Sequence, residues 1–170
     1  MDIHTNNLIF RPMDEKHARE VLHWNYDPPY DSYNFHEEQI EIGVEYLLDP
    51  DNHYYTIHNE EGELLAYCCY GIDAQVPGGD YDLEALDVGL GIRPDLTGQG
   101  SGIVFVEKVL DFARHRYHPL RFRVTIAEFN QRAQKVWRKA GFRQVMRFWR
   151  FLDGKAFVIL VREETDPNTV

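Results

Sequence analysis

Three glycines spaced two apart, Gly98, Gly100 and Gly102, are the residues of this chain best suited to binding chemistry. Glycine lets the backbone approach a ligand closely and adopt positive φ angles. The glycines join an apolar strand-like segment, 83–92, to a helix-like segment, 103–117. Because a helix N-terminus presents free N–H groups and the positive end of its dipole, the sequence predicts a phosphate or pyrophosphate site here. Glycine spacing alone also fits an ordinary tight turn between a strand and a helix.

A second segment, 130–142, is bounded like a short amphipathic helix. Asn130 suits the N-cap position, and Gly141 suits the position just after the last turn. Residues at the spacing i, i+3, i+4 and i+7 form one apolar face: Ala133, Val136, Trp137 and Ala140. Taken alone, this segment predicts a helix and no particular chemistry.

The two segments together resemble the GNAT superfamily of acetyl-CoA-dependent N-acetyltransferases. The family's R/Q-x-x-G-x-G/A motif is matched by residues 97–102, except at its first position. The later family motif N-x-x-A-x-x-x-Y-x-K-x-G-F is matched at Asn130, Ala133, Lys139, Gly141 and Phe142. The detailed resemblance covers residues 83–142. It implies an α/β fold with a mixed sheet, helices on both faces and the element order βααβββαβαββ.

The resemblance also implies acetyl-CoA as the cosubstrate and no metal. The pantetheine arm is expected between two splayed strands, 81–92 and 120–127, where a backbone N–H would stabilise the developing oxyanion. Gly89 and Gly91 in the first of these strands suit a bulge or the close approach of another backbone. The residues implied in cofactor binding are Leu90, Gly91, Ile92, Thr97, Gly98, Gln99, Gly100, Ser101, Gly102, Asn130 and Trp137.

Two residues depart from the family pattern. Thr97 stands where the family usually has arginine or glutamine, which removes one side-chain contact to the pyrophosphate. Trp137 stands where many members have a tyrosine that protonates the leaving thiolate, and an indole N–H is no such acid. Two functions therefore stay open: an active N-acetyltransferase, or an acyl-CoA-binding regulatory or catalytically degenerate module.

Family members commonly deprotonate the amine with a carboxylate on the fourth strand. Asp87 lies in the apolar part of that strand and is the candidate base. A structural hydrogen bond or ordinary exposure of Asp87 is the alternative interpretation.

The segment 24–35 alternates aromatic residues with acids and prolines and is too broken for a helix. In the family fold this region overlies the acceptor site. Aromatic faces together with the carboxylates of Asp27 and Asp31 suit an ammonium group, so we expect a small cationic amine or an exposed amino group of a peptide as acceptor. The predicted substrate residues are Trp24, Tyr26, Asp27, Tyr30 and Tyr33. The alternative is a loop pinned to the core by its aromatic rings.

The remaining elements follow from periodicity and turn residues. Two helices are expected between a first strand, 8–11, and a central hairpin. The expected strands after them are 54–58, 64–72, 81–92, 120–127, 144–152 and 155–162, the last two joined by the turn Asp153-Gly154.

Composition restricts the class of protein. The chain has 170 residues, 44% hydrophobic and 27% charged, which is typical of one globular domain. We expect this domain over residues 1–163 and a polar tail over 164–170. The net charge of −10 disfavours nucleic acid as a partner. The sequence shows no membrane-length apolar run and no signal-peptide pattern, so we expect a cytoplasmic monomer or homodimer without a membrane partner.

Neither the cysteines nor the histidines predict a reactive site. Cys68 and Cys69 are adjacent, so on a strand they point to opposite faces and cannot form a disulfide with each other. We expect them to be small buried residues. The eight histidines show no zinc-binding spacing and are expected at the surface.

Overall fold

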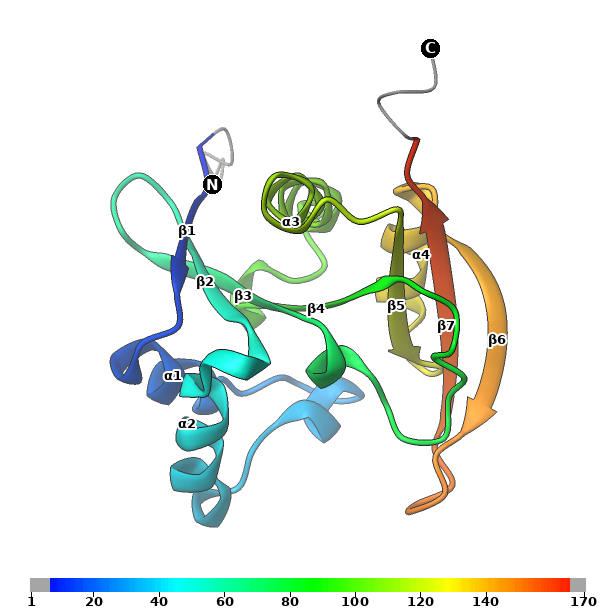
Figure 1. The fold of residues 1–170 in the computed structure, drawn as a ribbon. Helices are drawn as coiled ribbons and strands as arrows, with labels where there is room; N and C mark the ends of the chain where they lie inside the picture. The colour runs from blue at the N-terminus through cyan, green and yellow to red at the C-terminus, as the bar shows by residue number, and fades with distance from the viewer. Residues whose placement is uncertain (1–6, 166–170) are drawn as a thin grey trace.

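A seven-stranded mixed sheet in the order β1-β2-β3-β4-β5-β7-β6 runs through the computed structural model, which describes residues 7–165 (Figure 1). Its strands are β1 (Ile9–Pro12), β2 (Tyr54–His58), β3 (Leu64–Tyr70), β4 (Leu86–Ile92), β5 (Arg121–Ala127), β6 (Arg143–Trp149) and β7 (Ala156–Glu163). Only β4 and β5 pair in parallel, and all other neighbours are antiparallel. Both predicted hairpins, β2–β3 and β6–β7, are confirmed.

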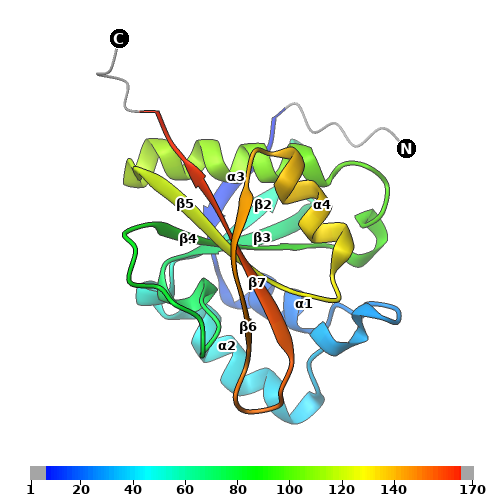
Figure 2. The same cartoon turned by 90° about the vertical axis from the view of Figure 1, so that its right-hand side faces the viewer.

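Helices cover both faces of the sheet, as predicted. The helices α1 (Glu15–Leu22) and α2 (Ile40–Leu48) lie on one face, and α3 (Gly102–Tyr117) and α4 (Gln131–Lys139) lie on the other (Figure 2). The main hydrophobic core forms where α3 and α4 pack on the sheet, with Phe105, Leu110 and Phe122 fully buried at its centre. Burial of such side chains contributes roughly 1.5–3 kcal/mol each, so this layer holds the strands that flank the site.

Strands β4 and β5 pair only at their first residues and then diverge. Their register comprises Leu86 opposite Phe122 and Asp87 opposite Arg123. Beyond these pairs β4 remains paired with β3 alone, whereas β5 remains paired with β7 alone. Figure 1 shows β5, β7 and β6 turning away from β1–β4. The predicted splay is therefore present, with its vertex at Asp87 and Arg123.

The strand predicted at 81–92 begins only at Leu86. Residue Tyr81 belongs instead to an irregular loop, because its hydroxyl accepts a hydrogen bond from Val76 N–H (2.9 Å) and contacts Thr125 Oγ1 (3.0 Å). Hydrophobic periodicity could not predict these contacts of Tyr81, because Val76 lies on the loop itself and Thr125 lies 44 residues further along the chain.

The two glycines of β4 make room for side chains of the neighbouring strand β3. The β3–β4 register is regular, without a bulge. A Cβ on Gly89 would lie 2.7 Å from Cys69 Sγ, and one on Gly91 would lie 2.3 Å from the ring of Tyr67. The glycines make room for cross-strand side chains. The expected bulge is therefore wrong, whereas the close approach of another backbone stays a prediction.

The cysteine prediction is confirmed, because Cys68 and Cys69 are both buried and free. At the C-terminal end, Glu164 was predicted to begin the tail but forms an ion pair with Arg114 (2.7 Å) and therefore belongs to the fold. The rest of the predicted tail, from 166 onward, lies outside the described residues.

Candidate active site

The loop between β4 and α3 presents a cluster of free backbone donors. Gly98 and Gly100 have φ angles of +75° and +81°, as predicted for glycines that shape an anion-binding loop. Within residues 7–165, none of the N–H groups from 98 to 103 donates a hydrogen bond to the protein. Ser101, the N-cap of α3, supplies no side-chain cap. The first donors of α3 therefore stay open to an anion.

The loop side chains bond to the loop's own backbone. Thr97 Oγ1 donates to the carbonyl of Pro94 (2.7 Å), and Gln99 Nε2 donates to the carbonyl of Asp95 (2.5 Å). These bonds fix the conformation of the loop. The groups of the loop that suit an anion such as a pyrophosphate are thus its backbone N–H groups.

The third glycine of the motif has a packing role. Gly102 does not have a positive φ angle, which corrects the prediction for this position. A Cβ there would lie 3.3 Å from the Val136 side chain of α4. The absence of a side chain lets the start of α3 approach α4 closely, and this contact positions the donor cluster.

The diverging edge of β4 offers further backbone groups. Arg93 N–H donates to the carbonyl of Leu65 in β3 (2.9 Å), so odd-numbered residues direct their polar groups toward β3. Leu90 and Ile92, both predicted to bind the cofactor, therefore direct theirs into the opening between β4 and β5. The Tyr26 hydroxyl donates to the carbonyl of Ile92 (2.7 Å) and covers the end of this edge.

Asp87, the predicted base, is bound on both carboxylate oxygens. Arg123 Nε donates to Oδ1 and Nη2 to Oδ2, each at 2.7 Å, and Gln75 Nε2 donates to Oδ2 at 2.9 Å. Both charged residues are 3% exposed. This geometry favours the structural interpretation of Asp87, because a base needs an oxygen free for the substrate proton. The sequence carries no signal for Arg123 as the partner, which lies 36 residues away.

Two predicted cofactor residues of the later motif lie at opposite ends of the helix α4. Asn130 caps the helix, since its Oδ1 accepts from Ala133 N–H (3.0 Å), as the sequence predicts. Trp137 is 4% exposed and packs its ring edge-on against Phe142, with 5.0 Å between centroids. The indole thus contributes to the core beside the predicted cofactor site.

The segment 24–35 spans the open side of the splay, from the end of β4 to the start of α4. Tyr26 reaches β4, whereas Tyr33 accepts a hydrogen bond from Asn130 Nδ2 (3.1 Å) and stacks near Phe129. Trp24 lies against Tyr67 of β3, at 5.7 Å between centroids. The aromatic rings therefore pin the segment, which supports the structural alternative for part of it.

The same segment carries two phenols in hydrogen bonds with the protein and two carboxylates without an ion-pair partner among the described residues. Burial raises the pKa of both Tyr26 and Tyr33 above the usual range, so both phenols are protonated at neutral pH. Asp27 and Asp31 are exposed, and neither has an ion-pair partner in the described part of the chain. The segment thus combines protonated phenols that bond the protein with two exposed carboxylates.

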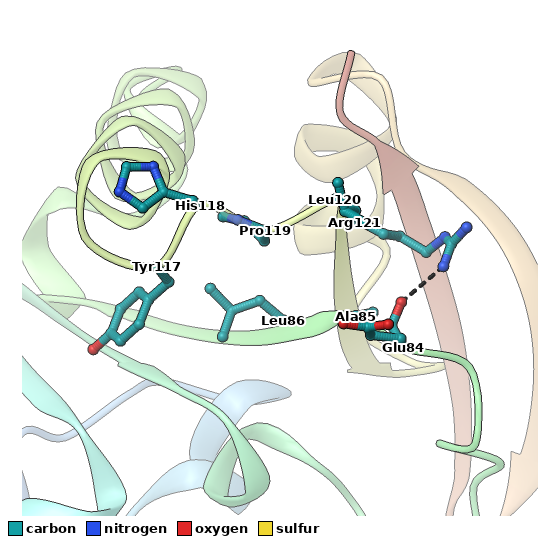
Figure 3. A pocket seen from close by; sticks show the side chains of 8 residues that line it. All are labelled: Glu84, Ala85, Leu86, Tyr117, His118, Pro119, Leu120 and Arg121. Atoms are coloured by element: carbon teal, nitrogen blue, oxygen red, sulfur yellow. Dashed lines mark hydrogen bonds between the residues drawn. The ribbon is translucent and has the colours of Figure 1, made fainter. Parts of the chain in front are cut away.

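A surface pocket at the opposite end of β4 lies away from these features. It has a volume of about 230 Å³ and is lined by Glu84, Ala85, Leu86, Tyr117, His118, Pro119, Leu120 and Arg121 (Figure 3). Arg121 Nη1 donates to the carbonyl of Glu84 across its rim (2.7 Å). The cavity is at the first residues of β4 and β5, whereas the donor loop follows the last residue of β4. It is not part of the candidate site.

The described part of the chain contains neither a cluster of metal-ligating side chains nor a membrane-spanning helix. Among residues 7–165, no group of three or more histidine, cysteine, aspartate or glutamate side chains is placed to hold a metal ion. None of the described helices has the length and apolar character needed to cross a bilayer.

Comparison with known proteins gives a match over most of the chain. A family model described as an acetyltransferase (GNAT) domain matches residues 7–143. A search of curated proteins finds no significant match.

Solved structures share the fold at low identity. A GNAT-family acetyltransferase from Bacillus anthracis has a TM-score of 0.69 at 15% identity, covering 92% of this chain and 94% of that one. A chimera of the Vibrio cholerae spermidine N-acetyltransferase SpeG and hSSAT has a TM-score of 0.65 at 14% identity, covering 92% and 95%. A structure described as a putative phosphinothricin N-acetyltransferase has a TM-score of 0.67 at 19% identity, covering 94% and 100%.

Proposed function

Because the chain belongs to the acetyltransferase (GNAT) family, we propose that it transfers an acetyl group from acetyl-CoA to a primary amine. One observation carries the proposal. The free N–H cluster of residues 98–103 lies directly after the unpaired edge of β4, so a pyrophosphate and an extended amide chain could be held end to end. Acetyl-CoA contains both groups, and when bound it supplies the reactive thioester.

Each part of the site has a proposed task. The N–H groups of residues 98–103 bind the pyrophosphate, and Leu90 and the N–H of Ile92 pair with the amides of the pantetheine arm. A backbone N–H of the same edge stabilises the oxyanion at the acetyl carbonyl. Asp87 fixes the vertex of the splay through Arg123, and the amine reaches the site in its neutral form by losing its proton to water.

No residue of α4 replaces the family's tyrosine as an acid. Trp137 lies in the core, and its indole N–H does not release a proton in this range. A thiol with a pKa near 8.5 is an adequate leaving group near neutral pH, so CoA departs as the thiolate or takes its proton from water. The buried Trp137 is also what keeps the second candidate, an acyl-CoA-binding module without turnover, in consideration.

The proposed acceptor is a cationic amine or an exposed amino group, bound beneath the segment 24–35. The exposed carboxylates of Asp27 and Asp31 and the protein's charge of −10 attract such a molecule. Spermidine, named for one structural relative, is of this chemical class. We further propose a cytoplasmic location and no nucleic-acid partner.

Calorimetry with CoA tests the cofactor site. Gly100→Asp places a carboxylate beside the pyrophosphate, and no atom lies within 4 Å of a Cβ at this position. Gly62→Asp is the matched control, because Gly62 has a similar φ angle, +83°, and open surroundings in the β2–β3 turn. We expect CoA binding to be lost in the first variant and kept in the second. Equal affinities in both would overturn the assignment.

Thiol release from acetyl-CoA with a panel of amines separates the two functions. An acetyltransferase releases CoA thiol at a rate that depends on the amine. A binding module gives calorimetric binding of CoA without thiol release above the uncatalysed rate for any amine.

A further inference from the structure

The donor loop lacks the charged or amide side chain that the family motif places at its first position. Thr97 stands there, and its hydroxyl is bonded to the carbonyl of Pro94. Backbone N–H groups alone would then face a diphosphate that carries two negative charges. A cation from another element would complete the site.

Arg132 in the first turn of α4 lies against this loop. Its Nη1 atom is 3.4 Å from the position that a Cβ of Gly98 would occupy. Its guanidinium carbon lies 4.1 Å from the centroid of the Tyr30 ring, which holds the planar group in place. Within residues 7–165 no carboxylate lies within 4 Å of Arg132, whereas Arg93 and Arg114 form ion pairs.

This placement is unfavourable for the protein by itself. Arg132 adds a positive charge to the N-terminal turn of α4, where the helix dipole is already positive and no acidic residue compensates it. The first turn of α3, with its free N–H groups, is packed against α4 through Gly102 and Val136. An anion in the loop would relieve the repulsion among these positive groups.

We propose that Arg132 binds the pyrophosphate of CoA and takes over the task of the side chain that Thr97 lacks. A guanidinium presents two parallel N–H donors that match phosphate oxygens. The stack on Tyr30 orders these donors before binding and links the cofactor loop to the segment 24–35. This inference rests on the proposed acetyl-CoA site.

Titration calorimetry with CoA and with 3′-dephospho-CoA tests the inference. A hydrogen bond to a charged group contributes enough for Arg132→Ala to weaken the binding of both ligands by about 10–100-fold. Because both ligands contain the 5′-diphosphate, the two losses should be equal. Arg132→Lys should recover part of the affinity, since it keeps the charge without the planar fork.

Arg138→Ala is the matched control on the same helix. Arg138 lies in the last turn of α4, far from the donor loop, and its side chain donates to Gln144 Oε1 of β6 (2.8 Å). Arg138→Ala removes one positive charge, as Arg132→Ala does, but should leave CoA affinity unchanged. Thermal unfolding of every variant should match the wild type. If Arg132→Ala unfolds early, Arg132→Gln keeps the length of the side chain and is compared instead.

Three results would overturn the inference. CoA affinity could be unchanged in Arg132→Ala, or the loss could disappear with 3′-dephospho-CoA, which would place the contact at the 3′-phosphate. If Arg138→Ala lost as much CoA affinity as Arg132→Ala, the loss would come from the change in net charge and not from a contact with the pyrophosphate. Absence of CoA binding in the wild type would instead contradict the proposed function itself, so the two failures are distinguishable.

Discussion

Replacing Asp87 by alanine distinguishes a base from a structural ion pair. The change leaves the guanidinium of Arg123, 3% exposed, without its carboxylate. Breaking a buried pair by removing one partner costs about 3–5 kcal/mol. Arg123 keeps a hydrogen bond to the carbonyl of Leu83 (2.8 Å) and lies over the ring of Tyr81 (4.8 Å), so we expect the lower end of this range.

Thermal unfolding followed by tryptophan fluorescence measures this loss. For a chain of this length, 3 kcal/mol corresponds to a fall in the unfolding midpoint of roughly 6–12 °C. The double variant Asp87→Leu with Arg123→Met removes both charges and should recover most of the stability, because a buried pair is often replaced by apolar residues at little cost. The turnover number is measured well below the midpoint of each variant.

If Asp87 were the catalytic base, its replacement would affect turnover more than stability. In that case Asp87→Ala would lower the turnover number by roughly 10²-fold or more while the protein remained stable. A stability loss below about 1 kcal/mol, typical of an exposed pair, combined with such a fall in turnover would refute the structural interpretation.

Further predictions concern thiols, the indole, the acceptor and the cofactor. Burial raises the pKa of Cys69 to about 12 and also raises that of Cys68, so both thiols should resist Ellman's reagent at pH 8 and react only after unfolding. Since unfolded thiols ionise near pH 8.5, stability should also fall as the pH rises above that value. Trp137→Phe should keep most of the turnover, whereas loss of a proton donor would cost roughly 10²-fold in a steady-state assay. Asp27→Asn should raise KM for a cationic amine about two- to five-fold and reduce the salt dependence of kcat/KM, which stopped-flow or steady-state rates at several ionic strengths would measure. CoA at 100 times its Kd should add about 2.7 kcal/mol of stability in a thermal shift assay, and Gly100→Asp should abolish this gain.

Caps, turns and backbone angles that depend on residues close in sequence could be predicted from the sequence. Asn130 caps α4 because its side chain reaches the N–H three residues on, and Asp153-Gly154 closes the β6–β7 hairpin through local backbone preference. The positive φ angles of Gly98 and Gly100 follow from the same local logic. The resemblance then supplied the element order and the splay, which local patterns alone do not contain.

Features set by distant partners could not be predicted. The carboxylate of Asp87 suggested a base because nothing in its own strand indicates Arg123, which β5 brings to its side. Nothing in the sequence around Gly91 indicates the Tyr67 ring of β3, which occupies the space that a Cβ at this position would need. In the sequence Arg132 is one of several basic residues of an amphipathic helix. Only the packing of α4 in the fold places it beside Gly98 of the loop between β4 and α3.

The diverging edge of β4 makes the two interpretations of the segment 24–35 compatible. An unpaired strand edge invites pairing with other chains unless something covers it. The Tyr26 hydroxyl satisfies the carbonyl of Ile92, and Tyr33 ties the same segment to the start of α4 through Asn130. The aromatic residues must therefore hold the segment over the opening whether or not an acceptor is bound. In the proposed reaction such a cover would also form one wall of the space that the amine enters, so its structural role would determine its place in the site.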